Sequence, residues 1–444
     1  MIVPRSRLLF WVSAIVLPFA LLIAIAPAGA AVSLAVIAGL FLVAAVDAFG
    51  ARKNLVGVEV ALPDVTRMSK GRESKLELRI RNEGRQKKKV CIGLAWPPEI
   101  TAEMDEMDAQ LPAESEWSRL SWSCTPAKRG NYRLNSTFVE TESPLGLWAA
   151  RKELPAASEI RVYPNLLGER KSLAALFLNR GAFGLHAQRQ IGKGRDFEKL
   201  REYVPGDGFD EIHWKATARR GKPITKVFQI EKTQEVYVII DASRLSARQA
   251  ADSADKPDLL ERFVTAALVL GLAAEQQGDL FGLITFTNKV DRFVRAKNGQ
   301  SHYSGCRDAL YTLEPKIVTP DFDELFRFIR VRLRRRALLI FLTALDDPAI
   351  AENFTHNIEL IRRQHLVLVN MIQSPAVRPL FSNTEVTGMD DLYRELGGHL
   401  RWQKLRELQK VLQRRGIQFS LLANERLSAD IVSQYLNVKR RQLL

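Results

Sequence analysis

The sequence is poor in the residue patterns that mark cofactor and metal sites. It has three cysteines, widely spaced and never in a Cys-x-x-Cys pair, which indicates buried thiols in a reducing compartment rather than disulfides or a zinc site. Its six histidines never show the His-x-x-x-His spacing of a helical metal site. The patterns GxxxxGK[ST], strand-GxGxxG-helix and GxSxG are also absent. We therefore expect neither a nucleotide-binding loop nor a serine hydrolase with its nucleophile in a GxSxG turn.

Positive charge, by contrast, is abundant. The 444 residues carry a formal net charge of +15, concentrated in the runs 81–89, 330–336 and 439–441. We expect the first at a hairpin turn, the second at the end of a helix and the third near a terminus, which favours solvated surface. Binding of anionic lipid or nucleic acid is the alternative, and nucleic acid is the less expected because no aromatic-rich RNA-binding signature or helix-turn-helix pattern accompanies the runs.

Two long apolar runs stand at the start of the chain, at 8–26 and 31–49. Each is about nineteen residues long, just enough to cross a bilayer. A cleaved secretory signal is the competing interpretation, because Arg5 and Arg7 precede the first run and small residues follow it. A signal has a shorter apolar region and needs no second span, so residues 1–53 are predicted to form a transmembrane helical hairpin.

The charges beside these runs predict the orientation of the hairpin. Arg5 and Arg7 precede the first run, Arg52 and Lys53 follow the second, and the turn between the runs has no charge. The positive-inside rule then places both ends and everything after them in the cytoplasm. We expect a multi-pass protein of the bacterial inner (cytoplasmic) membrane with cytoplasmic domains.

Three further regions follow along the chain. Residues 54–165 contain short alternating strands at about ten-residue spacing, which predicts an all-β immunoglobulin-like sandwich. Residues 166–234 are predicted to be a linker block and joint. Residues 235–444 alternate continuous apolar runs with amphipathic helix patterns, which predicts an α/β doubly wound, Rossmann-type domain with its functional crevice at the carboxyl ends of the strands.

A carboxylate and a hydroxyl, Asp241 and Ser243, end the first strand of that domain. They resemble the start of the Asp-x-Ser-x-Ser motif in the metal-ion-dependent adhesion site of von Willebrand A domains, but Leu245 replaces the last serine. Oxygen ligands of this kind suit Mg²⁺, so a degenerate magnesium site is one hypothesis. Further candidate ligands are Ser301, Ser304, Thr343 and Asp346. In the alternative, Asp241 caps the following turn and Ser243 satisfies backbone amides.

The stretch before this strand, 192–223, is dense in charge, aromatics and turn residues. From Phe183 to Ala242 the chain resembles the family called domain of unknown function 58, whose members carry a block like G-x-DF-x-x-LREY-x-x-GD followed by I-x-W-K-x-x-AR. The matching residues are Gly194, Asp196, Phe197, Leu200, Arg201, Glu202, Tyr203, Gly206, Asp207, Ile212, Trp214, Lys215, Ala218 and Arg219. His213 departs from the common aspartate, and Asp210 from the common arginine.

The resemblance implies a von Willebrand A-like domain, no established activity, and a MoxR-type AAA+ ATPase and other membrane or von Willebrand A proteins as partners. We expect a non-enzymatic membrane scaffold or adaptor that binds such partners around Asp241. In this interpretation the charged block forms structural ion pairs, and Tyr203 and Trp214 fill the seam of the joint. The alternative is a hydrolase that uses the block from Asp196 to Arg220 and gathers Asp207, His213 and Arg219 in one pocket.

Overall fold

The structure of the protein is a computed structural model. It describes residues 1–25, 29–84, 87–169, 173–174, 191–205, 207–229, 234–248, 258–374, 376–380, 382 and 388–441, with the backbone alone at 52–53, 191–199 and 227–229. The chain divides into two compact units, Met1–Asn165 and Leu166–Leu444. Each unit has its own core, and each is described separately below.

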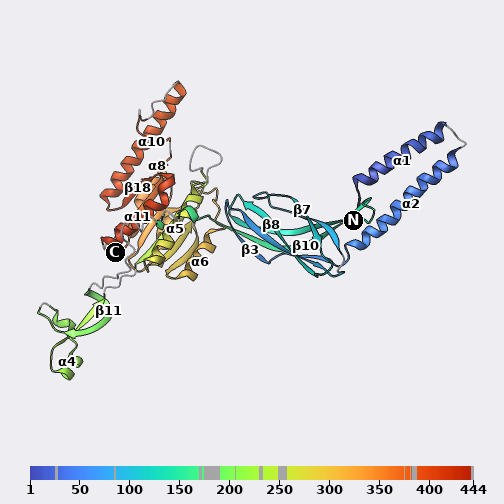
Figure 1. The fold of residues 1–444 in the computed structure, drawn as a ribbon. Helices are drawn as coiled ribbons and strands as arrows, with labels where there is room; N and C mark the ends of the chain where they lie inside the picture. Colours follow the sequence, from blue (N-terminus) through green and yellow to red (C-terminus); the bar gives the residue numbers. More distant parts are fainter. Residues whose placement is uncertain are drawn as a thin grey trace. The chain divides into compact units, whose positions relative to one another are not determined.

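The first unit begins with a short strand, β1 (Ile2–Pro4), and two apolar helices, α1 (Ser6–Ile25) and α2 (Ala30–Asn54), which run side by side in Figure 1. Both helices are long and apolar enough to cross a membrane, with mean hydropathies of 2.7 and 2.4. Their large side chains face outward: Leu17 is 68% exposed and Phe49 is 72% exposed. The expectation of two N-terminal apolar helices is confirmed.

Ten strands form a two-sheet β-sandwich. β1 precedes the two helices in the chain, and the other nine strands follow them. One sheet has the order β1-β10-β9-β5-β7 with β3 beside β10, and the other has the order β2-β4-β8-β6. The remaining strands are β2 (Val58–Ala61), β3 (Val65–Ser69), β4 (Ser74–Asn82), β5 (Lys88–Leu94), β6 (Ile100–Ala102), β7 (Glu106–Leu111), β8 (Trp117–Pro126), β9 (Gly130–Glu142) and β10 (Trp148–Tyr163).

Alternation along the strands builds the core of this sandwich. Leu76, Leu78 and Ile80 point inward from β4 at 0–1% exposure, while the residues between them are exposed. Trp122 of β8 is fully buried among them and donates its indole N–H to the carbonyl of Met104 at 2.9 Å. The period-two pattern therefore predicted the buried face of the sheet correctly.

A small lobe occupies residues 191–229, where the sequence predicted a linker. It consists of β11 (Ile191–Glu202), a 3₁₀ turn η2 (Phe209–Glu211), α4 (Trp214–Arg220) and β12 (Ile224–Gln229), with β11 and β12 paired antiparallel. Gly221 ends α4 in the left-handed region at φ 65°, a conformation that favours glycine. The block is thus a folded hairpin with a short helix, because its turn residues bring two strands into register.

The α/β part of the second unit is a six-stranded sheet of order β15-β14-β13-β16-β17-β18. All neighbours are parallel except β14 and β15. The strands are β13 (Glu235–Asp241), β14 (Leu280–Phe286), β15 (Val290–Lys297), β16 (Leu338–Leu342), β17 (Leu366–Ile372) and β18 (Gln418–Leu422). This confirms the predicted mixed α/β content.

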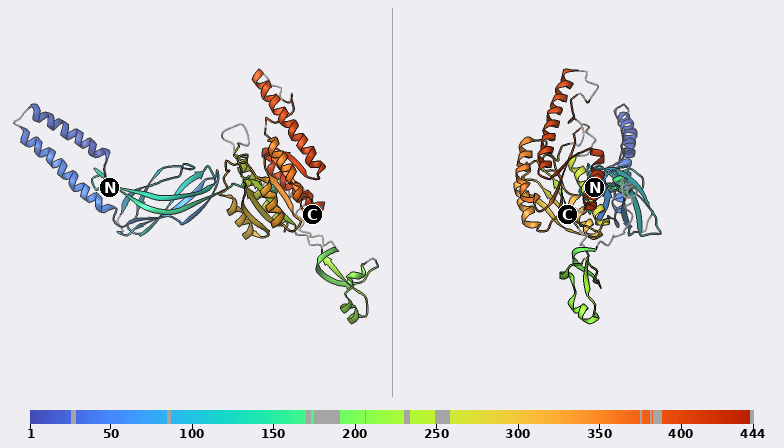
Figure 2. Two further views of the ribbon diagram at one scale, coloured as in Figure 1. Left: turned by 180° about the vertical axis from the view of Figure 1, so that it is seen from behind. Right: turned by 90° about the vertical axis from the view of Figure 1, so that its left-hand side faces the viewer.

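Helices cover both faces of this sheet (Figure 2). One core joins the sheet to α5 (Leu259–Gln276), α6 (Gln300–Leu310) and α11 (Leu427–Arg440). The other core joins it to α7 (Phe322–Arg332), α8 (Pro348–Asn357), α9 (Glu359–Arg362) and α10 (Met389–Arg414). Because the parallel strands are covered on both sides, they are continuous apolar runs, whereas the antiparallel edge strand β15 (VDRFVRAK) is not.

Candidate functional site

Asp241, the last residue of β13, is 0% exposed and lies at the carboxyl edge of the sheet. Its Oδ1 accepts the backbone N–H of Ser243 at 2.9 Å, and its Oδ2 accepts the hydroxyl of Thr343 at 2.7 Å. Thr343 follows β16, the neighbouring strand, and is also 0% exposed. The carboxylate therefore ties together the two loops that leave the central strands.

Ser243 stabilises the turn that follows. Its Oγ accepts the N–H of Leu245 at 3.3 Å, and its carbonyl accepts the hydroxyl of Ser246 at 2.8 Å. Leu245 is fully buried in the core against α7 and α8. These contacts are the turn-stabilising roles that the sequence offered as the alternative to metal binding.

Asp346 lies near the same edge but has a different partner. Its Oδ2 is 2.5 Å from the guanidinium of Arg248, and its Oδ1 is buried with no partner among the described residues. Arg248 has a side-chain exposure of 47%, and Arg244 in the same turn is exposed. The turn after buried Asp241 therefore carries two exposed cations, Arg244 and Arg248.

Ser301 and Ser304 are not brought to this cluster. Both lie on α6, where the neighbouring His302 contacts the carbonyl of Phe281 at 2.8 Å. Phe281 is near the amino end of β14, whereas Asp241 pairs in register with Phe286 at the carboxyl end of that strand. The two serines therefore lie toward the opposite edge of the sheet, a relation that sequence spacing does not show.

The residues around Asp241 do not fit a magnesium ion. Mg²⁺ prefers octahedral oxygen ligands, but both Asp241 oxygens and the Ser243 Oγ already accept hydrogen bonds. Asp346 pairs with a cation, and among the described residues no three His, Cys, Asp or Glu side chains gather closely enough to hold a metal. Burial raises the pKa of the Asp241 carboxyl.

The signature block lies in the β11–β12 lobe. Ile212 is buried, Glu202 is 3.9 Å from Lys222, and Leu200, Trp214, Lys215, Ala218 and Arg219 are exposed. Gly194, Asp196 and Phe197 lie in β11 where the backbone alone is described, and Gly206 is outside the described residues. Tyr203 stacks on Phe209 with ring centroids 6.4 Å apart. Trp214 is 68% exposed within this lobe.

Asp207 and His213 have separate structural partners within this lobe. Asp207 accepts the N–H of Val204 at 3.1 Å and pairs with Arg201 at 2.6 Å, and these contacts lower the pKa of its carboxyl. His213 caps α4 by accepting the N–H of Ala216 at 3.1 Å. Ion pairing and capping, rather than one shared pocket, account for these two side chains.

Members of the basic runs also have intramolecular partners. Arg81 is 2.8 Å from Glu116, and Lys89 is 2.8 Å from Asp108. Lys439, in the last turn of α11, is 2.8 Å from the buried carboxylate of Asp279. The run 330–336 includes the end of α7, as predicted. These three cations therefore form ion pairs within the chain, and those contacts compete with binding of an anionic ligand.

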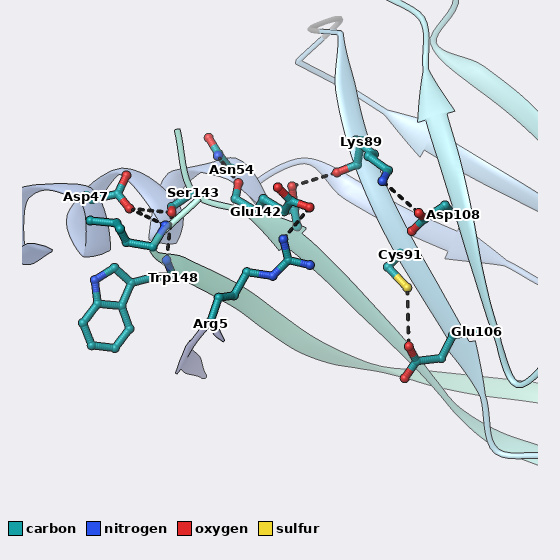
Figure 3. Close-up of polar contacts among 12 residues, drawn as sticks. Arg5, Asp47, Asn54, Lys89, Cys91, Glu106, Asp108, Glu142, Ser143 and Trp148 are labelled. Atoms are coloured by element: carbon teal, nitrogen blue, oxygen red, sulfur yellow. Dashed lines mark hydrogen bonds and ion pairs between the residues drawn. The ribbon is translucent and has the colours of Figure 1, made fainter. Parts of the chain in front are cut away.

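A site that sequence reasoning missed lies at the end of α2 (Figure 3). Asp47 is 3% exposed, and its carboxylate accepts the Ser143 hydroxyl at 2.5 Å and the N–H groups of Leu145 and Leu147 at 3.0 and 3.3 Å. The indole of Trp148 donates to the Ala44 carbonyl at 2.8 Å. A lone carboxylate at the end of an apolar run was the signal, but its partners are about a hundred residues away.

Fold and site together define a two-unit protein in which a pair of apolar helices is joined to a β-sandwich, followed by an α/β unit whose strand-end carboxylate organises loops. Residues 199–386 match the family model described as "Protein of unknown function DUF58". The match agrees with the family resemblance that the signature block predicted, over residues 199–386.

Comparisons with other proteins add little to this assignment. No curated protein matches the chain. An uncharacterized membrane spanning protein from Vibrio fischeri is 12% identical, over 46% of this chain and 98% of that one, with a TM-score of 0.18. A protein of unknown function from Porphyromonas gingivalis W83 is 9% identical, over 39% and 98%, with a TM-score of 0.18. The YadV chaperone is 9% identical, over 24% of this chain and about half (52%) of its own, with a TM-score of 0.17. Scores this low establish no shared overall fold.

Proposed function

We propose that this chain is a membrane-anchored, non-enzymatic adaptor whose α/β unit, of the von Willebrand A-like type, binds an acidic surface of a partner protein. In this proposal α1 and α2 span the bacterial inner membrane and an immunoglobulin-like sandwich and the α/β unit lie in the cytoplasm. The basic flanks Arg5, Arg7, Arg52 and Lys53 support this orientation. Lipid would cover the apolar side chains that α1 and α2 leave exposed.

The observation that carries the proposal is the hydrogen bond between Asp241 and Thr343 at 2.7 Å. It links the loops after β13 and β16, at the edge where sheets of this type bind their ligands. Both residues are fully buried, so neither can touch a partner. They act as positioning residues for the exposed side chains of the loops.

Those exposed side chains include three cations, of which Arg248 pairs with Asp346 and Lys316 pairs with Asp291 at 2.6 Å. Arg244 and Arg248 come from the loop after β13, and Lys316, with a side-chain exposure of 54%, donates its backbone N–H to the carbonyl of Ala242 at 2.8 Å. A basic rim held by a rigid turn suits an acidic patch on a folded protein. A MoxR-type AAA+ ATPase, which the family resemblance implies, is the proposed partner.

Affinity capture of the full-length chain from native membranes tests this proposal. Arg244→Glu reverses one rim charge without touching the buried cluster, so the captured amount of the main partner should fall at least severalfold. Arg334→Glu is the matched control, because Arg334 is also exposed but precedes β16 at the other edge of the sheet. If Arg244→Glu captures the same proteins in the same amounts as wild type, the rim is not the binding surface.

A further inference from the structure

Helix α10 has apolar side chains on two opposite sides. One side packs on the α/β sheet through Leu405 and Leu412, which are 2% and 0% exposed. The other side carries five large apolar residues in the first three turns: Met389 at 67%, Leu392 at 40%, Tyr393 at 65%, Leu396 at 43% and Leu400 at 51% exposure. Their spacing of three and four residues places them along one stripe, the α10 stripe.

Contacts of α10 within its own unit leave this stripe uncovered by described residues. Residues 376–380 lie against a different side of the helix: Arg378 pairs with Glu395 at 3.1 Å, and the N–H of Leu380 donates to His399 Nδ1 at 3.0 Å. A Cβ on Gly398 would be 2.0 Å from the Ala376 carbonyl oxygen, so this glycine is required for the packing. Figures 1 and 2 show the first turns of α10 extending beyond the body of the unit.

Charge along α10 changes sign from one end of the stripe to the other. Asp390 and Asp391 stand in the first turn, whereas Arg401 and Lys404 follow the stripe. Two such helices side by side in the same direction would place like charges together. Side by side in opposite directions, the acidic turn of each meets the basic turn of the other.

We propose that the Tyr393–Leu400 part of the α10 stripe binds the same part of α10 in a second copy of this chain, with the two helices antiparallel and centred between Leu396 and Gly397. In that register Tyr393 of one copy lies against Leu400 of the other, and Leu396 lies against Gly397. A Cβ on Gly397 would meet nothing within 4 Å, so this position offers the space that a facing leucine needs. Asp390 and Lys404 lie about two turns on either side of the centre and pair between copies.

A contact confined to three turns of helix is smaller than the roughly 800 Å² per partner of a stable soluble interface. Two copies in one bilayer meet at a high effective concentration, which allows such a small contact to form. This step rests on the membrane anchoring under Proposed function; the pairing of the stripes itself does not.

Disulfide cross-linking in native membranes tests the register, with the full-length chain in a Cys91→Ala background because Cys124 and Cys306 are buried. Gly397→Cys places two thiols near the proposed centre, so oxidation should give a covalent dimer. Glu407→Cys is the matched control: this exposed position is ten residues along the helix, and its two copies would be about 30 Å apart in the antiparallel pair. We expect at least a fivefold excess of dimer for Gly397→Cys.

Charge reversal, read out by the same Gly397→Cys dimer, tests the pairing of the ends. Asp390→Lys and Lys404→Asp should each lower the dimer yield severalfold, and the two together should restore it. Equal yields at positions 397 and 407, no recovery in the double variant, or a Gly397→Cys adduct with a different protein in place of the dimer would each overturn the proposal. Capture by another protein would instead make the stripe that protein's docking site.

Discussion

Two buried aspartates, one in each unit, differ in how many hydrogen bonds their carboxylates accept. Asp47 ends the apolar part of α2 and accepts three hydrogen bonds from the 143–148 turn, two of them from backbone N–H groups. Asp241 ends β13 and accepts one backbone N–H and one hydroxyl. Both link segments about a hundred residues apart.

The difference between the two sites is what their removal would leave behind. Without Asp47, two backbone N–H groups and a hydroxyl lose their acceptor at the place where the helices meet the sandwich. The Arg5–Glu142 pair at 2.5 Å and the Asn54–Glu142 contact at 3.1 Å surround the same turn. Without the Thr343 hydroxyl, only one oxygen of Asp241 is left without a donor. A buried polar group left without a partner costs more free energy than a hydrogen bond contributes net to stability. We therefore expect the Asp47 site to be more sensitive to mutation than the Asp241 site.

The largest effect is expected for Asp47→Ala. Leaving the buried donors of the 143–148 turn without an acceptor should lower the free energy of unfolding of the first unit by about 3 kcal/mol. Thermal unfolding in detergent, followed by the circular dichroism of the sheet, measures the change. Asp105→Ala is the control, because Asp105 is an exposed loop carboxylate of the same unit. Equal midpoints for the two variants would show that Asp47 does not hold the turn.

His365 sharpens the comparison, because it is a buried titratable group with no partner at all among the described residues. It is 4% exposed, both ring nitrogens lack a hydrogen bond, and burial lowers its pKa to about 4. The unfolded chain, with a pKa near 6.5, binds the extra proton as pH falls from about 6.5 to about 4. The contribution of this group to the free energy of unfolding is therefore fully present above pH 6.5. It is lost as the pH falls through that window, by up to about 3 kcal/mol at 1.36 kcal/mol per pKa unit.

His365→Leu removes this titration and keeps the site apolar. Denaturant unfolding of the variant should therefore depend less on pH between 6.5 and 4 than unfolding of the wild type, with no loss of stability at pH 7. His356→Leu, at an exposed position on α8, should leave the pH dependence unchanged. A variant with the full wild-type pH dependence would assign the proton uptake to other groups.

A smaller effect is expected for Thr343→Val, which keeps the side-chain shape and removes the hydroxyl that reaches Asp241 Oδ2. The second unit should lose about 2 kcal/mol of unfolding free energy, less than the first unit loses in Asp47→Ala. Denaturant unfolding of Thr343→Val beside Thr319→Val, an exposed threonine, gives the difference. A loss as large as that of Asp47→Ala would remove the contrast between the two aspartates.

Local sequence patterns determined much of this protein. Apolar length determined α1 and α2, period-two alternation determined the buried face of β4, and continuous apolar runs determined the parallel strands of the α/β sheet but not the antiparallel edge strand β15. The signature block predicted the match of residues 199–386 to the family model. Each of these is encoded within about twenty neighbouring residues, where periodicity and residue type report burial directly.

Only the tertiary structure decided which groups meet. Ser301 and Ser304 follow the strands at a plausible distance along the chain, yet they lie toward the other edge of the sheet from Asp241. Asp346 pairs with Arg248, and Asp47 finds its donors 96 to 100 residues away. Hydrogen bonds require atoms within about 3 Å, and strand order and helix packing, not spacing along the chain, set those distances.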